Sequence, residues 1–179
     1  TNAEAYQFYL RGRFYWNKRT PEGLKKAIEQ FQQAVDKDPS YALAYAGLAD
    51  AYSTLPGYTA TPANEVVQKA SATAARAIEL DPDLAEAHAS LAGTMMNFNS
   101  DPAVAEKELQ RAIELNPNYP TAHHWYALLL ANLGRIDEAK REIRRAQQLD
   151  PLSLIINRTV GLSSRARRHR RDLRNERPV

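Results

Sequence analysis

Ala77-Ile-Glu-Leu-Asp-Pro82 and Ala112-Ile-Glu-Leu-Asn-Pro117 are two copies of one phrase that the chain carries four times. The other two copies are Ala34-Val-Asp-Lys-Asp-Pro39 and Ala146-Gln-Gln-Leu-Asp-Pro151. The four prolines lie 43, 35 and 34 residues apart, and a further alanine lies seven residues before each phrase. A repeat of about 34 residues is typical of stacked helix pairs. It predicts an all-α fold, a right-handed superhelical solenoid of antiparallel helix pairs.

The helix ends can be predicted from prolines and capping residues. Each phrase ends in Pro, which cannot donate a helical hydrogen bond and excludes helical geometry from the residue before it. Thr20-Pro21, Thr61-Pro62 and Asp101-Pro102 each place a capping oxygen before a Pro at the first helical position. The predicted helices cover roughly 3–17, 22–37, 41–55, 62–80, 84–98, 103–115, 119–133 and 136–149, with a ninth from about 153.

These helices predict one domain followed by a tail. The domain, residues 1–162, contains four units at about 3–39, 41–82, 84–117 and 119–151, and a vestigial fifth from 153. The tail, residues 163–179, is expected to be partly a capping helix, from about Ser153 to Arg168, and disordered after about Arg171. Apolar surface around Ile155 and Leu162 predicts weak homodimerisation through this end.

Composition narrows the class of protein. The 179 residues contain no cysteine, so no disulfide framework or thiolate metal site exists, and a reducing, cytoplasmic compartment is expected. No apolar stretch reaches the length of a membrane span, so no membrane partner is expected. The chain begins at Thr1 without Met, which is compatible with an upstream domain or a removed leader.

The repeated residues resemble the tetratricopeptide repeat. The fourth unit carries its pattern at Tyr126, Leu130, Gly134, Ala139, Ile143, Ala146 and Pro151, and the second at Tyr45, Leu48, Tyr52, Ala70, Ala77 and Pro82. In the first unit, the helix around Leu10 to Trp16 fits the pattern in two registers. The segments Tyr9–Thr20 and Thr121–Tyr126 further resemble tetratricopeptide regions at the carboxyl end of bacterial signalling proteins. There the region follows a winged-helix domain, a serine/threonine kinase domain or a nucleotide cyclase.

Catalytic chemistry is not indicated. The chain has no Gly-rich phosphate loop, Ser-centred elbow or Cys nucleophile, and we expect no catalytic residues, metal or cofactor. His88 and His123 fall in the aromatic slot of their repeats, where a structural role is expected. His123 and His124 are adjacent in a predicted helix and point about 100° apart, so they cannot grip one metal ion together. The resemblance therefore implies a non-enzymatic interaction module within a larger regulatory protein.

In this family the concave groove is lined by the first helix of each pair. The resemblance therefore implies a groove that binds a peptide or helix of a partner protein, and the alignment of the repeats indicates which residues line it. The groove residues are Tyr9, Trp16, Asp50, Thr54, Ser90, Met96, Asn97, His124, Trp125, Leu128 and Asn132. Trp125 is the strongest candidate, since buried aromatic anchors dominate such interfaces; alternatively, a neighbouring helix or the tail covers it. Some members of the family hold the terminal carboxylates of a partner with basic residues at set groove positions. At those positions this chain has Ala46, Asp50, Ser90, Thr121 and Trp125. The absence of basic residues there argues against ligands with acidic ends.

The tail permits a function of another class. Its arginines could bind nucleic-acid phosphates without sequence preference. Those in the densest part are Arg165, Arg167, Arg168, Arg170 and Arg171. A polar cap on the solenoid, a disordered tail and a change of reading frame near Leu162 are the alternatives. Without the tail, residues 1–162 are mildly acidic, so only the tail has a basic character.

Overall fold

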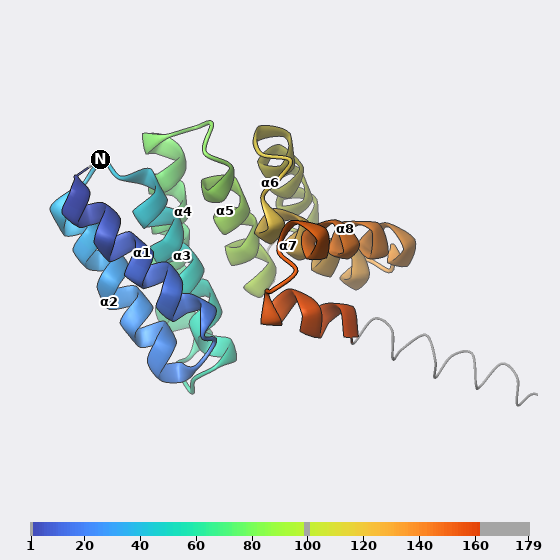
Figure 1. Ribbon diagram of the computed structural model, residues 1–179, viewed down its shortest axis with the longest axis horizontal. Coiled ribbons are helices and arrows are strands. Elements are labelled where there is room, and N and C mark those ends of the chain that lie inside the picture. Colours follow the sequence, from blue (N-terminus) through green and yellow to red (C-terminus); the bar gives the residue numbers. More distant parts are fainter. Residues whose placement is uncertain (1, 99–100, 162–179) are drawn as a thin grey trace, which may run out of the picture. The chain divides into compact units, whose positions relative to one another are not determined.

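Helices make up the regular structure of the chain. The computed structural model describes residues 2–98 and 101–161. Within these residues the chain forms helices and turns and no β-strand. The predicted all-α class is confirmed (Figure 1). The chain divides into two units, Thr1–Pro117 and Asn118–Val179. The Arg-rich tail, with Arg165, Arg167, Arg168, Arg170 and Arg171, lies outside the described residues.

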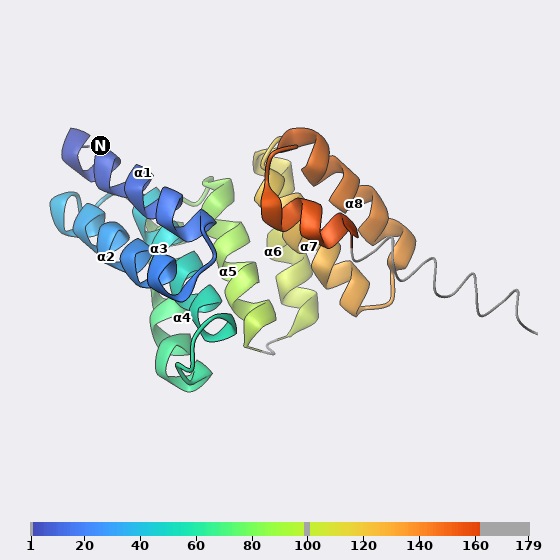
Figure 2. The same cartoon turned by 60° about the horizontal axis from the view of Figure 1, so that its bottom comes forward.

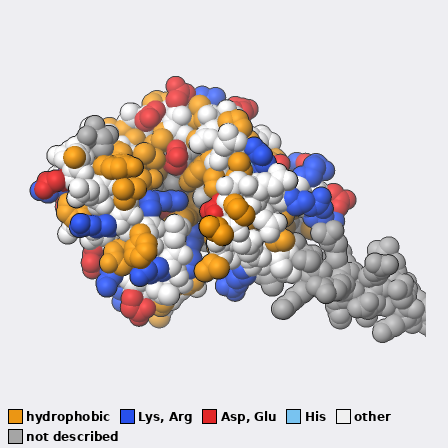
Figure 3. Space-filling model, in the orientation of Figure 1, with side chains coloured by type: hydrophobic (Ala, Val, Ile, Leu, Met, Phe, Trp, Pro, Cys, Tyr) orange, Lys and Arg blue, Asp and Glu red, His pale blue; other side chains and the backbone are white. Residues whose placement is uncertain are grey.

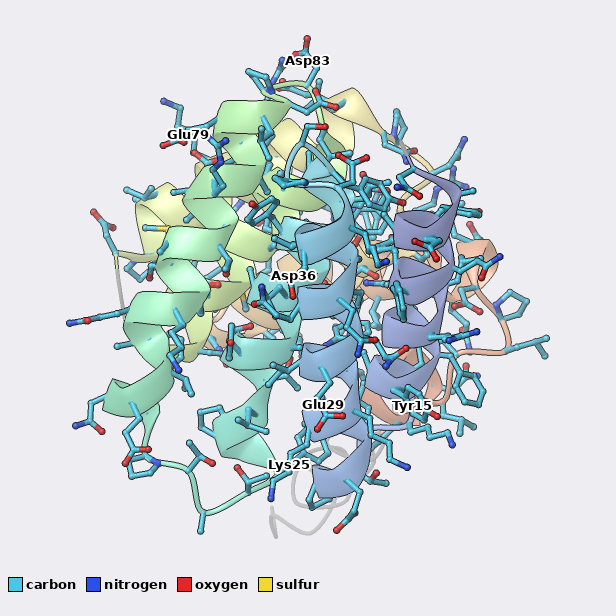
Figure 4. The ribbon with its side chains drawn as sticks, turned by 90° about the vertical axis from the view of Figure 1, so that its left-hand side faces the viewer. Tyr15, Lys25, Glu29, Asp36, Glu79 and Asp83 are labelled. Carbon is cyan, nitrogen blue, oxygen red and sulfur yellow. The ribbon has the colours of Figure 1, made fainter. Side chains whose placement is uncertain are left out.

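The first unit contains three helix pairs. They are α1 (Ala3–Asn17) with α2 (Pro21–Lys37), α3 (Ala42–Thr54) with α4 (Ala63–Leu80), and α5 (Ala85–Asn97) with α6 (Pro102–Leu115). A short 3₁₀ turn, Leu55–Gly57, lies in the long connection between α3 and α4. Figure 4 shows α1 and α2 side by side, with Tyr15 on α1 and Glu29 on α2. Each later first helix packs on the pair before it: α3 contacts α1 and α2, and α5 contacts α3 and α4.

The second unit contains α7 (Pro120–Asn132), α8 (Ile136–Leu149) and a further helical segment at 154–161 (Figure 2). Ile156 of that segment is buried in a cluster with Ala127 of α7 and Ile143 of α8. The segment therefore packs on the pair, and the rest of the predicted capping helix, beyond residue 161, lies outside the described residues. The exposed apolar side chains at this end are those of Leu152 and Leu154. Ile155, where exposed apolar surface was predicted, is half-buried against the cluster. Homodimerisation through this end stays a prediction.

All eight named helices begin and end within one residue of their predicted ranges. Two of the three predicted amino-terminal caps are present: Thr20 Oγ1 accepts a hydrogen bond from Gly23 N, and Asp101 Oδ1 accepts one from Ala103 N. The third is wrong. Pro62 itself is the extended residue before α4, and the hydroxyl oxygen of Thr61 lies 3.0 Å from that of Thr59.

The repeated phrase ends its helix in the same way each time. The backbone N–H of the residue before each proline donates to the carbonyl oxygen of the phrase's alanine, at 2.9–3.0 Å. These donors are Asp38, Asp81, Asn116 and Asp150, and their φ angles are −144°, −148°, −140° and −137°. Steric conflict with the proline ring excludes helical geometry at the preceding residue, so the last hydrogen bond forms and the helix stops.

Phe31 of α2 lies between two glycines and settles the register of α1. A Cβ added to Gly12 of α1, or to Gly47 of α3, would lie 2.5 Å from Phe31 Cε1. Only glycine allows both helices to approach the ring this closely. The sequence permits two registers for α1. The structure has the one in which Gly12 faces α2, the second helix of the same pair.

The two histidines in aromatic slots connect the helices of their pairs. His88 Nδ1 lies 2.6 Å from Glu108 Oε2, and His123 Nδ1 lies 2.7 Å from Glu142 Oε2. The other ring nitrogen of His88 lies 2.9 Å from the carbonyl oxygen of Pro82. Both side chains thus hold a first helix to its second helix, the structural role expected for them.

We expect Gly47→Ala to lower the free energy of unfolding by about 1–3 kcal/mol, because the new methyl group would overpack Phe31. Helix propensity acts in the opposite direction, by up to about 1 kcal/mol, so a net loss reports the steric conflict. Gly57→Ala is the matched control, since a Cβ there meets nothing within 4 Å. Urea denaturation followed by circular dichroism measures both. Equal stability of the two variants would contradict the packing described for Phe31.

Candidate functional site

The first helices α1, α3 and α5 of the first unit bring most of the predicted groove residues together. α3 contacts both α1 and α5, so side chains of three successive pairs meet. We call this region the first-helix surface. Its members are Tyr9, Arg13, Trp16, Asp50, Thr54, Ser90, Met96 and Asn97. The other four predicted residues, His124, Trp125, Leu128 and Asn132, lie on α7 in the second unit.

Asp50 is the centre of the first-helix surface and joins its three helices. Its Oδ2 lies 3.3 Å from Arg13 Nη1 of α1, and its Oδ1 lies 2.6 Å from Ser90 Oγ of α5. The Ser90 hydroxyl also lies 3.1 Å from the carbonyl oxygen of Ala46, so its single proton can serve one of the two acceptors at a time. Asp50 and Ser90 are 2% and 1% exposed, so they form the floor of the surface.

Burial changes the proton affinity of Asp50. Loss of hydration disfavours the carboxylate and raises the pKa of Asp50 to about 6, against the opposing effects of Arg13, Ser90 and Arg19. Glu86 adds a smaller effect in the raising direction. The site therefore holds an ion pair near neutrality and a neutral carboxyl group in mild acid.

Trp16 is enclosed by two arginines. The guanidinium carbons of Arg13 and Arg19 lie 4.6 Å and 3.7 Å from the centre of its ring, and the indole is 2% exposed. Arg19 Nη1 also donates to Thr54 Oγ1 at 3.4 Å. Arg19 has a φ of 50°, the left-handed conformation that lets the chain turn from α1 into α2. Trp16 and Thr54 thus belong to the floor.

The accessible part of the surface is smaller than predicted. Tyr9 and Met96 are half-buried and Asn97 is exposed. The Asn97 side-chain amide donates to the carbonyl oxygen of Ser53 at 3.1 Å, which links the ends of α5 and α3. The ring of Tyr9 packs against Phe31 and Tyr41, at centroid distances of 5.9 Å and 5.5 Å. An approaching partner would meet an aromatic ring, a thioether and an amide.

The residues of α7 correct the prediction for Trp125. Its ring is 8% exposed, so it is no open anchor, and burial is the alternative that holds. It occupies the same helical position as Gly47 and Ser90, which are also buried. His124 is 4% exposed, and its Nε2 lies 3.0 Å from Thr159 Oγ1 of the 154–161 segment. Leu128 is half-buried and Asn132 exposed.

The sequence prediction missed Arg13 and Arg19, the cations of the site. Both depend on the register of α1, which the sequence left ambiguous. The signal was Gly12, because a glycine within a helix indicates close approach by another group. Among the described residues, no three His, Asp or Glu side chains are grouped to hold a metal ion. Nor is any helix in that part of the chain apolar and long enough for a membrane span.

The chain is similar in sequence to one protein family and to one group of known regulators. The profile of the family described as Tetratricopeptide repeat matches residues 108–141. Over 143 residues the chain is 28% identical to Transcriptional regulator HilA of Salmonella typhimurium, and the same holds for HilA of Salmonella typhi. That stretch is 80% of this chain and 26% of HilA, so the chain spans only part of these relatives' length.

Solved structures agree on the fold. A thermophilic tetratricopeptide-repeat protein of Thermus thermophilus has a TM-score of 0.72 at 20% identity, over 90% of this chain and 81% of that one. The first such domain of Spaghetti (RPAP3), bound to the HSP90 peptide SRMEEVD, has a TM-score of 0.55 at 19% identity, over 75% and 96%. YrrB, a protein with an unusual peptide-binding site, has a TM-score of 0.50 at 24% identity, over 83% and 72%.

The burial of Asp50 predicts a pH-dependent stability. The folded chain binds a proton at Asp50 below about pH 6, whereas the unfolded chain does so near the ordinary value of 3.8. Between these values the folded state holds more protons, so the stability that Asp50 contributes falls as pH rises from about 4 to 6 and is level above that. The shift of about two pKa units corresponds to about 3 kcal/mol.

Asp50→Asn removes this titration. The stability of wild type minus that of the variant should therefore fall by about 3 kcal/mol between pH 4 and pH 7. Urea titrations in a Trp125→Phe background, where Trp16 is the only tryptophan, report the first unit directly. A difference that is constant or rises with pH would show that Asp50 is not the buried acid described.

Proposed function

We propose that the chain is a non-enzymatic interaction module of the tetratricopeptide-repeat type that binds a peptide or helix of a partner protein along the first-helix surface. The arrangement of this surface carries the proposal. Asp50 of α3 bonds residues of both α1 and α5, and Tyr9, Met96 and Asn97 on these two helices are less buried than Asp50. A preorganised floor lowers the ordering cost of binding. Two proteins of similar fold bind peptides according to their descriptions, which supports the proposal.

The accessible side chains define the ligand chemistry. An aromatic ring and a thioether offer apolar contact, and the amide of Asn97 can pair with a peptide backbone. We therefore expect an extended or helical segment with apolar anchors. The larger context is part of the same proposal: the similarity to a transcriptional regulator that is much longer than this chain favours a role as one module of a bacterial regulatory protein in the cytoplasm.

Selection from a phage-displayed random peptide library on the immobilised chain would provide a ligand, and fluorescence anisotropy its affinity. We expect Met96→Asp to weaken binding by at least about tenfold, because it places a charge against the apolar anchor. Val104→Asp on α6 is the matched control, since Val104 is an exposed apolar residue of a second helix. Equal affinities of the two variants for the selected peptide would contradict the proposal.

The peptide SRMEEVD tests the class of ligand. We expect no binding below about 1 mM, because the floor presents the Asp50 carboxylate, and its neighbour Arg13 is already engaged by that group. Titration at low salt, where charge attraction is strongest, is the demanding condition. Micromolar binding that disappears when the terminal carboxylate is blocked would overturn the expectation and reassign the groove to acidic chain ends.

Nucleic-acid binding by the Arg-rich tail is the second candidate. Seven arginines between residues 163 and 179 motivate it. Phosphate contacts release counterions, so such binding should weaken steeply with salt, with a slope of about −0.9 per contact on duplex DNA. We expect deletion of 163–179 to abolish any such binding in a filter assay while peptide binding is retained. Salt-insensitive binding, or retention in the deletion variant, would contradict a role for the tail.

A further inference from the structure

An apolar stripe on α1 is exposed on the outside of the first unit. Tyr6, Leu10 and Phe14 are 49%, 47% and 58% exposed. Residues four apart advance about 40° around a helix, so the three side chains form one continuous line, which we call the α1 stripe. Figure 3 shows apolar side chains next to Lys and Arg side chains on the surface over α1.

Two of the three positions of the α1 stripe, those of Leu10 and Phe14, are buried in the other first helices of the unit. Gly12 of α1 corresponds to Ala49 of α3 and to Ala92 of α5. The residues two positions before them, Leu10, Gly47 and Ser90, therefore correspond to one another as well. Gly47 packs against Phe31 of the preceding pair, and the Ser90 hydroxyl contacts Ala46 of the preceding first helix.

The position of Phe14 follows the same rule. Its counterparts Ala51 and Thr94 are 0% and 2% exposed. In α3 and α5 this side of the helix therefore receives a neighbouring helix pair, whereas in α1 it carries three large apolar side chains in the open. The geometry of the unit thus defines the shape of what fits there: a helix lying along α1.

The charges beside the α1 stripe are positive. Arg11 and Lys18 lie on one border, and the Lys18 ammonium is 4.5 Å from the centre of the Phe14 ring. Arg13 lies on the other border and is bonded to Asp50. The acidic residue of α1, Glu4, forms an ion pair with Lys37 at 2.9 Å. A helix with carboxylates beside its apolar face would complement this border, whereas a second copy of the stripe would bring the same cations.

We propose that the α1 stripe is a docking site for an acidic amphipathic helix of another polypeptide, one with apolar side chains at three- and four-residue spacing and Asp or Glu beside them. Such a helix covers Leu10 and Phe14 as the preceding pairs cover Gly47 and Ala51. Its carboxylates face Arg11 and Lys18. The ligand of this site differs from that of the first-helix surface, although Arg13 borders both.

Two synthetic probes test this site on the full 179-residue chain. Both are capped helical peptides of about 18 residues with leucine at i, i+4, i+7 and i+11; one has glutamate and the other lysine beside the leucines. Fluorescence anisotropy at low salt should show at least about tenfold tighter binding of the glutamate peptide. The double variant Leu10→Ser/Phe14→Ser should lose that binding, and Leu133→Ser, an exposed apolar control in the second unit, should keep it.

Charge reversal provides a test that does not depend on stability. In Arg11→Glu/Lys18→Glu the preference should switch to the lysine peptide. Equal affinities of the two peptides for the wild-type chain would overturn the proposal, as would loss of binding in Met96→Asp, which would place the peptide on the first-helix surface. Self-association that sedimentation detects in wild type and that Leu10→Ser/Phe14→Ser removes would assign the stripe to a second copy and overturn it too.

Discussion

The extended residue before each repeated proline is the constraint on which the rest of the structure depends. In all four phrases this residue has nearly the same φ and ψ, and its N–H completes the last helical hydrogen bond. The next helix then begins three residues after the proline, at Ala42, Ala85, Pro120 and residue 154. One steric rule, applied four times, thus sets both where a second helix ends and where the next first helix starts.

A fixed starting point determines which side of each first helix meets the preceding pair, and small residues on that side allow close approach. Gly47 and Ser90 are the examples in the first unit. Close approach has an electrostatic consequence, since it removes Asp50 from water. An ion pair buried in this way contributes little net stability, because desolvation offsets most of the attraction, yet removal of one partner is costly. The bonds from Asp50 to Arg13 and Ser90 therefore serve mainly to set how α1, α3 and α5 are aligned.

The helices could be predicted from sequence because local chemistry decides them: prolines, capping oxygens and alanine spacing act within one turn. The floor of the site could not. Its pairings join residues 37 to 40 positions apart, and Arg13 could be placed only once Gly12 was known to face Phe31. The prediction that Trp125 is an open groove anchor was wrong for a related reason. A helical position predicts the direction of a side chain, whereas its exposure depends on what lies over it, and the sequence left that open.

Arg13 connects the two surfaces of the first unit physically. Its guanidinium bonds Asp50 in the floor and stacks on Trp16, and its place on α1 is also one border of the α1 stripe. A carboxylate brought to that border would compete with Asp50 for the same cation. Because burial raises the pKa of Asp50 to about 6, its hold on Arg13 weakens as the pH falls toward that value, while an exposed carboxylate stays ionised. The proton affinity of one buried acid therefore bears on both surfaces, although their ligands differ.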